Sequence, residues 1–450
     1  MKKNIVLIVL AMSLVTVWSI QIYAATESNW SGFHRTRGII EGDWTGDDSE
    51  GMDRTLVDTR SQLQLEAKLN DQLSVFTQFR VDAEWGDYNK YARIQSNSKD
   101  LGVLRSYVDC KLGAVNLSIG VQELFLARGI MLNDNGPAVK IDYSLTDQLS
   151  LGFQWIKVIE GGYGDKKNQD IDYYIINPTL KPSDKLSISP FLLYARSDEI
   201  NTYAQKFDAD GDGIVVDDEA FSSSWLRELS NPLFDKLDMV YLGVDVDITL
   251  GMASLWFTGI YEWGSVDLKQ PILKKDSVDI SGFAFATGGT IDLGQISLYG
   301  QIFYGSGDDI NDNDIDINSF IPTEGGYYYW SEIMGLGNND WQTVNNMHWS
   351  LSNVIGGGVG ATIKAMPKLT LDGSIWYAAA VEDFIGARSG NKVDADMYGT
   401  EINCIATYDV LDNLSLTLIG AYVFAGDGIT EGVKNDQNPY TIISQLKVDF

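Results

Sequence analysis

Apolar and polar residues alternate with a period of two along most of the chain. From Arg60 to Lys68 every second residue is polar, and from Ser74 to Glu84 polar side chains again share one face. This period is typical of half-buried β-strands, whereas an amphipathic helix repeats about every 3.6 residues. No segment of useful length shows the helical period, so the pattern predicts an all-β fold.

The alternation predicts eighteen strands, an even number that returns both ends of the chain to one side of a membrane. A closed barrel with this many strands encloses a wide aqueous channel. The predicted strands begin near Gly32, Leu56, Leu73, Leu101, Val115, Pro137, Leu149, Asp170, Lys185, Asp235, Met252, Val278, Gln295, Asn353, Leu369, Met397, Leu414 and Tyr440.

The connections between these strands alternate in length. Tight turns fall at residues 70–72, 113–114, 146–148, 182–184, 251, 293–294, 366–368 and 411–413. The intervening connections are long and polar, for example residues 42–54, 86–100, 200–234, 307–352 and 426–438. Short periplasmic turns and longer external loops are typical of membrane barrels. We therefore predict that residues 26–450 form an antiparallel, up-and-down transmembrane β-barrel.

The outward strips of the predicted strands are apolar. Leu255, Phe257, Tyr261 and Trp263 share one face of a strand, and aromatic residues near strand ends form the interfacial girdles of membrane barrels. The chain ends at Phe450, which closes an amphipathic strand. Such an end resembles the signature that outer-membrane barrels present to their assembly machinery. We therefore expect that machinery to bind Phe450 and outer-membrane lipid to surround the barrel.

Residues 1–25 have the composition of a targeting segment. Lys2 and Lys3 precede an apolar run from Ile5 to Val17, and small residues follow near Ala24. These features predict a bacterial signal peptide that is removed from the mature chain. The alternative is a retained membrane anchor, which is disfavoured because the run is short for a spanning helix.

The chain is strongly acidic, with 33 basic against 62 acidic residues and a net charge of −29. Nucleic acid is therefore not an expected partner, because phosphate binding requires clusters of Lys and Arg. Cys110 and Cys404 lie in apolar strand patterns far apart in the sequence. A disulfide between them is one alternative, but we expect two thiols that are buried or face lipid.

Two stretches resemble the porins and alginate-export-type barrels of Gram-negative outer membranes. One is Gly-Val-Gln-Glu-Leu at residues 120–124, followed by Arg128, which is similar to the family's fifth-strand motif. The other is Gly-Thr-Glu-Ile-Asn at residues 399–403, which is similar to its penultimate hairpin. The resemblance implies an 18-stranded channel and gives Gln122 and Arg128 as pore-lining candidates. Val121 stands where the family often has an arginine, so specificity for an acidic polysaccharide is not carried over.

Polar strand faces supply the other candidates for the channel lining, because the lumen of a wide barrel is hydrated. Eight of the eleven arginines precede residue 140, so the first strands can build one basic wall. Acids on later strands would face it, and opposed charges decide which ions pass. Alternatively, neighbouring charges simply pair and stiffen the wall, and the ion preference stays open. The pore-lining candidates are Arg60, Gln62, Gln64, Arg80, Asp82, Glu84, Arg105, Asp109, Gln122, Arg128, Asp245, Asp247, Asp372 and Glu401.

Residues 208–219 match the spacing of an EF-hand calcium loop, with acids at positions 1, 3, 5 and 12 and glycine at position 6. Calcium takes about six to eight oxygen ligands. The predicted ligands are Asp208, Asp210, Asp212, the carbonyl of Ile214 and Glu219. Bound calcium would order the external loop of residues 200–234, and the alternative is a merely acidic turn.

The predicted function is passive diffusion of ions and small hydrophilic solutes through an outer-membrane channel, and a homo-oligomer is compatible with it. An enzyme is disfavoured because neither of the two histidines, His34 and His348, has a serine partner motif. A structural or adhesive barrel could use the aromatic residues from Tyr327 to Trp330, although we prefer that this segment folds inward and narrows the channel. A barrel that sheathes an electron-carrying cytochrome is the remaining alternative, since the chain itself has no haem-attachment motif.

Overall fold

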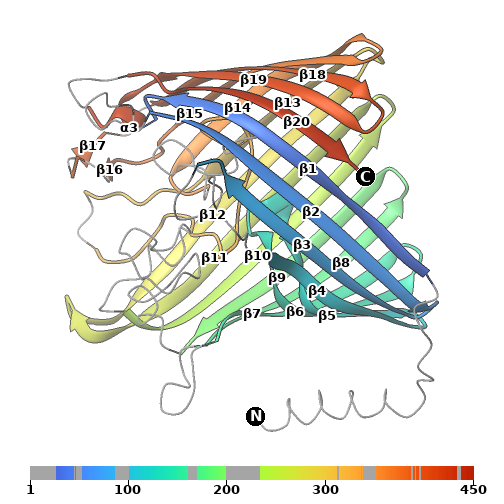
Figure 1. Ribbon diagram of the computed structural model, residues 1–450. Helices are drawn as coiled ribbons and strands as arrows, with labels where there is room; N and C mark the ends of the chain where they lie inside the picture. Colours follow the sequence, from blue (N-terminus) through green and yellow to red (C-terminus); the bar gives the residue numbers. More distant parts are fainter. Residues whose placement is uncertain are drawn as a thin grey trace.

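The computed structural model describes residues 27–44, 46, 53–86, 101–160, 170–198, 234–311, 314–335, 337, 351–386, 389–390, 392–394, 397–432 and 437–450. Within these residues eighteen strands form one antiparallel sheet, in which each strand pairs with the next barrel strand along the chain. The last strand pairs with the first, so the sheet closes into a barrel (Figure 1). No described helix is long and apolar enough to cross a bilayer.

The elements have the following bounds. The barrel strands are β1 (Glu27–Gly42), β2 (Arg54–Asn70), β3 (Leu73–Glu84), β4 (Gly102–Leu112), β5 (Val115–Leu126), β6 (Leu132–Thr146), β7 (Leu149–Ile159), β8 (Ile171–Ser183), β9 (Leu186–Ser197), β10 (Phe234–Leu250), β11 (Ala253–Ile272), β12 (Lys275–Asp292), β13 (Ile296–Gly305), β14 (Val354–Met366), β15 (Leu369–Ala379), β18 (Met397–Leu411), β19 (Leu414–Ala425) and β20 (Tyr440–Asp449). The connections carry η2 (Ala127–Gly129), β16 (Phe384–Ile385), β17 (Lys392–Val393) and α3 (Asp427–Thr430).

The structure confirms the predicted fold class and has a barrel strand at each predicted position. The predicted tight turns also lie where the sequence placed them. The prediction that every intervening connection is long is wrong for β5 and β6, which five residues join, and for β11 and β12, which a tight turn joins at Leu273 and Lys274. Both residues have positive φ, 49° and 71°. Asn or Gly usually occupies such turns, so nothing in the local composition marks this one.

Both ends of the barrel chain lie at the end that carries the tight turns (Figure 1). The amide of Gly32 donates to the carbonyl of Phe450 at 2.8 Å, and the amide of Phe450 donates to the carbonyl of Gly32 at 3.0 Å. The side chains of Phe450, Leu446 and Ile442 are exposed on the outward face. Phe450 therefore helps to close the barrel by pairing with the first strand. Its recognition by assembly machinery stays a prediction.

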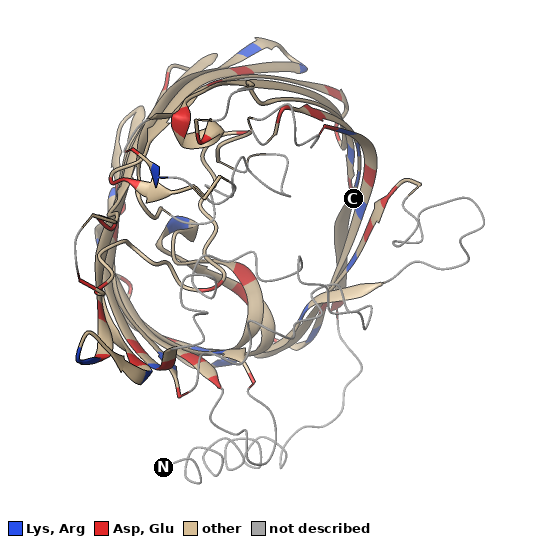
Figure 2. Ribbon diagram, turned by 90° about the vertical axis from the view of Figure 1, so that its left-hand side faces the viewer, with Lys and Arg blue, Asp and Glu red and all other residues tan. Residues whose placement is uncertain are grey.

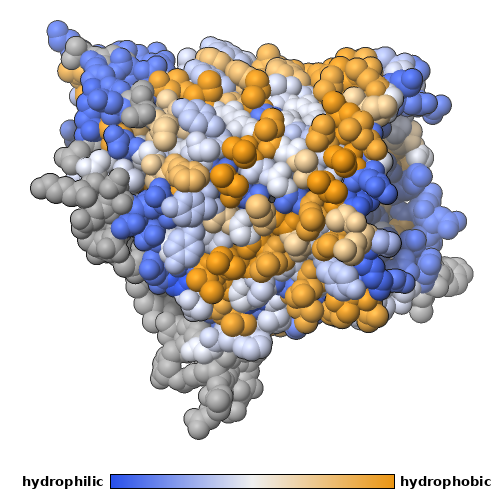
Figure 3. All heavy atoms as spheres, turned by 90° about the horizontal axis from the view of Figure 1, so that it is seen from above, coloured by the Kyte–Doolittle hydropathy of each residue, from blue (hydrophilic) through white to orange (hydrophobic). Residues whose placement is uncertain are grey.

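Outward side chains form cross-strand rows that change in character along the barrel axis. From the middle of β7–β10 toward the loops, the rows are Phe153 with Ile176, Leu192 and Leu242; Trp155 with Tyr174 and Tyr194; and Lys157 with Asp172, Arg196 and Asp238. This order matches hydrocarbon, interface and headgroup layer. Figure 3 shows the same zoning on another face, with apolar residues across the middle and hydrophilic residues at both ends.

The two cysteines belong to the outward face. Both thiols are free. Cys404 is exposed, and the outward residues around it on β18 and β19 are apolar. Cys110 is half-buried beside Leu117 on β5. The expectation of two thiols without a disulfide therefore agrees with the structure.

The inward face differs between the two sides of the barrel. Inward residues of β1–β4 are largely polar, whereas inward residues of β8–β15 include Tyr173, Leu193, Met239 and Phe303, which are fully buried. In an empty barrel these apolar side chains would meet water. They are buried because other parts of the chain occupy the lumen, and Figure 2 shows such segments inside the ring of strands.

Candidate functional site

The end of the β5–β6 hairpin leaves the barrel wall and enters the lumen. The ladder between β4 and β5 ends at Ser106 with Val121, and the ladder between β6 and β7 begins only at Ala138 with Ile156. β5 and β6 nevertheless stay paired up to Leu126 and Leu132. Residues 122–137, which we call the hairpin tip, are therefore paired with each other but share no backbone ladder with β4 or β7.

Gly120 is the point at which the hairpin departs. Its φ is 134°, and a Cβ added there would lie 2.4 Å from the carbonyl oxygen of Ser106 and 2.8 Å from the Cα of Tyr107. Residues with a side chain rarely adopt this φ, and the added Cβ would clash with backbone atoms, which cannot turn away as a flexible side chain can. A small cavity of about 130 Å³ lies between the hairpin tip and β7–β8, with Tyr173 in its lining. This cavity is consistent with a tip that stands off the wall.

Arg128 fastens the hairpin tip to β10 and β11. Its guanidinium pairs with Asp247 on β10 and lies 4.7 Å from the centroid of the Trp256 ring on β11. Ala127 and Arg128 have φ values of 53° and 54°, a conformation that costs non-glycine residues about 1–2 kcal/mol each. The contacts with Asp247 and Trp256 offset this strain. Arg128 therefore joins the hairpin tip to the inward face of β10 and β11.

The connection from β13 to β14 also lies in the lumen. We call its described part, residues 306–337 without 312–313 and 336, the inner loop. Its first part lies against β12. There the amide of Ser281 donates to the carbonyl of Ile317 at 2.9 Å, and the amide of Ile317 donates to the carbonyl of Asp279 at 2.9 Å. At the rim, Lys275 donates to Asp316 at 2.5 Å, and this bond lowers the pKa of the Asp316 carboxyl.

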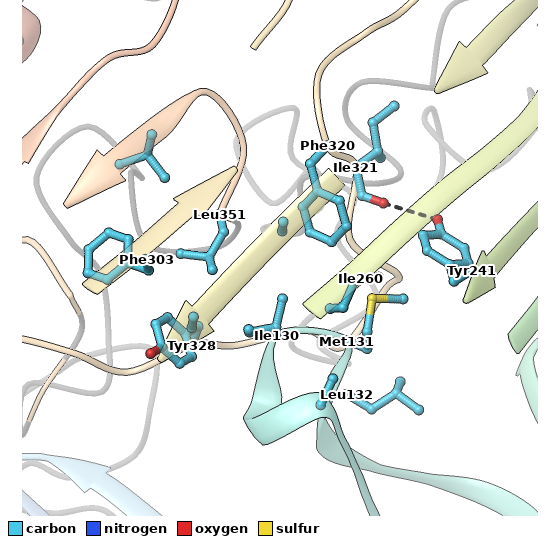
Figure 4. Packing of buried hydrophobic residues seen from close by; sticks show 14 of the residues in the cluster. Ile130, Met131, Leu132, Tyr241, Ile260, Phe303, Phe320, Ile321, Tyr328 and Leu351 are labelled. Atoms are coloured by element: carbon cyan, nitrogen blue, oxygen red, sulfur yellow. Dashed lines mark hydrogen bonds between the residues drawn. The ribbon is translucent and has the colours of Figure 1, made fainter. Parts of the chain in front are cut away.

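Inward side chains of β10 and β11 hold the middle of the inner loop. The amide of Ile321 donates to Glu262 Oε1 at 2.7 Å, and the hydroxyl of Tyr241 donates to the carbonyl of Ile321 at 3.0 Å (Figure 4). Glu262 and Tyr241 are fully buried. The hydroxyl of Thr323 donates to the carbonyl of Met131, so the inner loop and the hairpin tip also bind each other.

The aromatic segment of the inner loop turns inward, as preferred from the sequence. The amide of Tyr327 donates to the carbonyl of Gly129 at 2.8 Å. Trp330 packs against Phe303 of β13 and Trp376 of β15, with ring centroids 4.8 and 5.8 Å apart. Tyr328 contacts Phe303 edge-on. These rings belong to one apolar core with the hairpin tip, which fills the β8–β15 side of the lumen (Figure 4).

The opposite side of the lumen carries the basic residues. Lys447, Arg35 and Arg60 form one inward cross-strand row with Asp82. Arg60 Nε lies 2.6 Å from Asp82, and Arg80 pairs with the same carboxylate. We call the inward faces of β1–β4 the basic wall. Arg37 in this wall is fully buried, whereas the side chains of Arg60 and Arg80 are 19% and 30% exposed.

Arg105 belongs to the same wall and points toward the hairpin tip. It lies 3.1 Å from Glu123 and donates to the side chain of Asn135 at 2.5 Å. Next to it, Tyr107 stacks on Phe76 with ring centroids 5.0 Å apart. The wall thus presents arginine and aromatic groups side by side, with acids from the hairpin tip facing them.

The remaining sequence-derived candidates also face inward, with different degrees of cover. Gln62 accepts from Gln78 at 2.9 Å, and Gln64 accepts from Ser31 at 3.3 Å. Asp245 accepts from Thr258 at 2.5 Å, and Asp109 accepts from Ser118. Asp372 accepts from Tyr299 at 2.8 Å and from Thr362 at 2.5 Å. Glu84 shares the inward row of Asp58. Their role as pore-lining residues stays a prediction.

Two of the candidates do not face open solution. Gln122 is 4% exposed and donates to the carbonyl of Ala138 at 3.0 Å. Glu401 is fully buried because the inner loop covers it. Both side chains point to the lumen side, but each forms hydrogen bonds with other parts of the protein and is covered by them. The expectation that Glu401 presents a charge to passing ions therefore does not fit its burial.

The predicted calcium ligands lie outside the described residues, as does the whole loop of residues 200–234. In the part of the chain that the structure does describe, no group of three or more His, Cys, Asp or Glu side chains is arranged to hold a metal ion. Calcium binding at residues 208–219 therefore stays a prediction.

Sequence reasoning missed residues that hold the lumen segments in place. Glu262 and Tyr241 are the main examples, and Gly120 entered only as part of a motif. One signal for Glu262 was present: it is an acid on the inward face of β11 between Ile260 and Gly264, where its neighbours are not charged. An isolated carboxylate on an apolar inward face indicates a partner inside the barrel.

The fold and the obstructed lumen define a class of protein, the 18-stranded membrane β-barrels with inward-folded connections. The structure is similar to the outer membrane protein OpdK of Pseudomonas aeruginosa, with 8% identity, a TM-score of 0.55, and 95% of this chain and 100% of that chain covered. It is also similar to OccAB1 of Acinetobacter baumannii, with 14% identity, a TM-score of 0.55, and 96% and 99% covered. At these identities the similarity concerns the fold. No protein-family model and no curated protein sequence matches the chain.

Proposed function

We propose that this protein is a channel of the Gram-negative outer membrane through which small hydrophilic solutes diffuse along the basic wall. The observation that carries this proposal is the unequal filling of the lumen. An apolar core occupies the β8–β15 side, while the β1–β4 side keeps partly exposed charged groups. A barrel with a closed, fully packed interior would not place Arg60 and Arg80 on its inward face, because burying charges in a closed core is costly. Their partial exposure therefore favours a water-filled path.

A hydrated space at the turn end of the same wall supports the proposal. A cavity of about 620 Å³ lies there, and its lining includes Lys68, Asp109, Lys111 and Asn116. These residues continue the polar side of the lumen from Arg105 toward the periplasmic mouth. Solutes that pass the hairpin tip and the inner loop would leave the barrel on this side.

The composition of the basic wall favours small organic anions. One solved structure of similar fold is that of OpdK with vanillate, with a TM-score of 0.56 and 8% identity. In the present chain Arg105 lies two residues from Tyr107, whose ring stacks on Phe76, and Arg80 lies further along the same inward face of β3. Guanidinium groups bind carboxylates and aromatic rings stack on one another. We therefore infer that carboxylates with a flat apolar part pass best.

The test is ion selectivity in planar bilayers. Wild-type protein is expected to give conductance steps, and reversal potentials across a salt gradient should shift toward cations in Arg80→Ala and Arg105→Ala. Arg196→Ala is the matched control, because Arg196 lies on the outward face and is exposed. Unchanged reversal potentials in both lumen variants would refute the role of the basic wall. A folded wild-type protein without conductance steps would refute the channel and leave the adhesive or sheath barrel.

A further inference from the structure

We propose that Glu401 keeps the channel open by seating the second half of the inner loop on the barrel wall, an inference that rests on the proposed function. Glu401 lies on the inward face of β18 and is fully buried. Its partners are about seventy residues earlier in the chain, in the inner loop. No solute needs to touch this carboxylate for it to control passage, because it acts through the position of the loop.

The inner loop aims four hydrogen-bond donors at the two oxygens of Glu401. Oε1 accepts from the amides of Glu332 at 2.8 Å and Ile333 at 2.9 Å. Oε2 accepts from the amide of Met334 at 2.7 Å and from the hydroxyl of Ser331 at 2.9 Å. An ionised carboxylate accepts at both oxygens, and successive backbone amides that converge on an anion form a strong binding site. The arrangement therefore fits an ionised Glu401.

The segment that Glu401 holds is a compact unit. The amide of Gly337 donates to Ser331 at 2.6 Å, and the amide of Trp330 donates to Gly335 at 3.1 Å. Residues 330–335 therefore close on themselves, and Trp330 joins them to the rings of β13 and β15. The middle of the inner loop is held independently, by Glu262 and Tyr241. Loss of the Glu401 contacts would therefore release this unit without detaching the whole loop.

The direction of the expected movement follows from the position of the unit. Residues 331–334 lie directly on the wall at β18, so a released unit can move only toward the centre of the barrel. Tyr329, which is already 46% exposed, would move with it. The space that remains for solutes runs along the basic wall, which only β19 and β20 separate from β18 in the sheet. Release therefore narrows or closes the channel, and seating by Glu401 keeps it open.

Glu401→Gln is the sharpest test, because Gln has the same shape. Its amide has one oxygen and one NH₂ group, so either orientation turns NH₂ toward two of the loop donors. Losing hydrogen bonds to a buried charged group is expected to raise the fraction of time spent closed by at least about tenfold. Glu401→Asp keeps the charge but is shorter, so its effect should be smaller. Asp238→Asn is the control, since Asp238 lies on the outward face of β10 and pairs with Lys236.

Two measurements decide the proposal. Single-channel recordings should show frequent closures in Glu401→Gln and wild-type behaviour in Asp238→Asn. Independently of conductance, a thiol placed by Met334→Cys in a Cys110→Ser, Cys404→Ser background should be labelled at least about tenfold faster when Glu401→Gln is added, because Met334 is fully buried. Equal labelling with and without that change would overturn the seating role even if wild type does not conduct.

Ser331→Ala is the second test, for the case in which Glu401→Gln fails to assemble. Ser331→Ala removes one of the four donors from the loop side and leaves β18 intact. It should increase closures and thiol labelling in the same direction, by a smaller factor than Glu401→Gln. Wild-type closures and labelling in Ser331→Ala would contradict the proposal, whereas absent conductance in wild type would contradict only the proposed channel function.

Discussion

The departure of the hairpin tip from the wall depends on Gly120, and Gly120→Ala tests this dependence. The φ of 134° lies in a region that is essentially open to glycine alone, and residues forced into such regions lose about 1–3 kcal/mol. The added methyl group would also lie 2.4 Å from the carbonyl oxygen of Ser106. That oxygen is backbone of β4 and can move only with the wall, so overpacking adds about 1–3 kcal/mol. We expect a loss of about 2–6 kcal/mol in the free energy of unfolding.

Urea titration in lipid vesicles, followed by tryptophan fluorescence, measures this free energy. Gly420→Ala is the matched control, because a Cβ at Gly420 meets nothing within 4 Å and its φ is not positive. The control should be neutral or stabilised by about 0.4–1 kcal/mol. If Gly120→Ala and Gly420→Ala both unfold within about 0.5 kcal/mol of wild type, the hinge role assigned to Gly120 is wrong.

Three further predictions concern the wall, the lipid face and the rim. Asp58→Ala leaves the fully buried Arg37 without the carboxylate that it contacts at 3.0 Å, so the urea midpoint should fall by an amount equivalent to about 3–5 kcal/mol, and an unchanged midpoint would contradict this. Leu418→Lys places a charge in the apolar band and should cost about 2–4 kcal/mol in vesicles, which a cost near zero would refute. Lys275 lowers the pKa of Asp316, so the stability gained from this bond is present above the unfolded pKa and is lost as pH falls through the folded value. A carbon-13 titration of Asp316 should give a midpoint below about 3.9 that rises in Lys275→Met.

Most of the fold could be predicted because its determinants are local. The alternation of side chains defines each strand, and Gly, Asn and Asp mark most turns, as at Asn70 and Gly113. The turn at Leu273 and Lys274 was not predicted, because the two long strands that it joins determine its backbone conformation and its own residues do not. Sequence rules describe what a residue prefers, and this turn is an exception to those preferences.

The site could be predicted only in part, because the lumen contacts join distant segments. Alternation correctly places Arg80 and Asp247 on inward faces, since that depends on parity alone. It cannot show that Arg128 reaches Asp247, because the hairpin tip keeps its strand pattern after leaving the wall. For the same reason Glu401 looked like a channel charge. Its burial follows from a loop whose path no local pattern encodes.

The apolar inward face of β8–β15 has a consequence for biogenesis. A cylinder that closed before the inner loop docked would trap water against side chains such as Tyr173 and Met239, at a cost of about 25 cal/mol for each Å² of apolar surface. Closure of the seam at Gly32 and Phe450 and packing of the interior are therefore thermodynamically linked. A newly inserted barrel reaches its full stability only after water has left the apolar side of its interior.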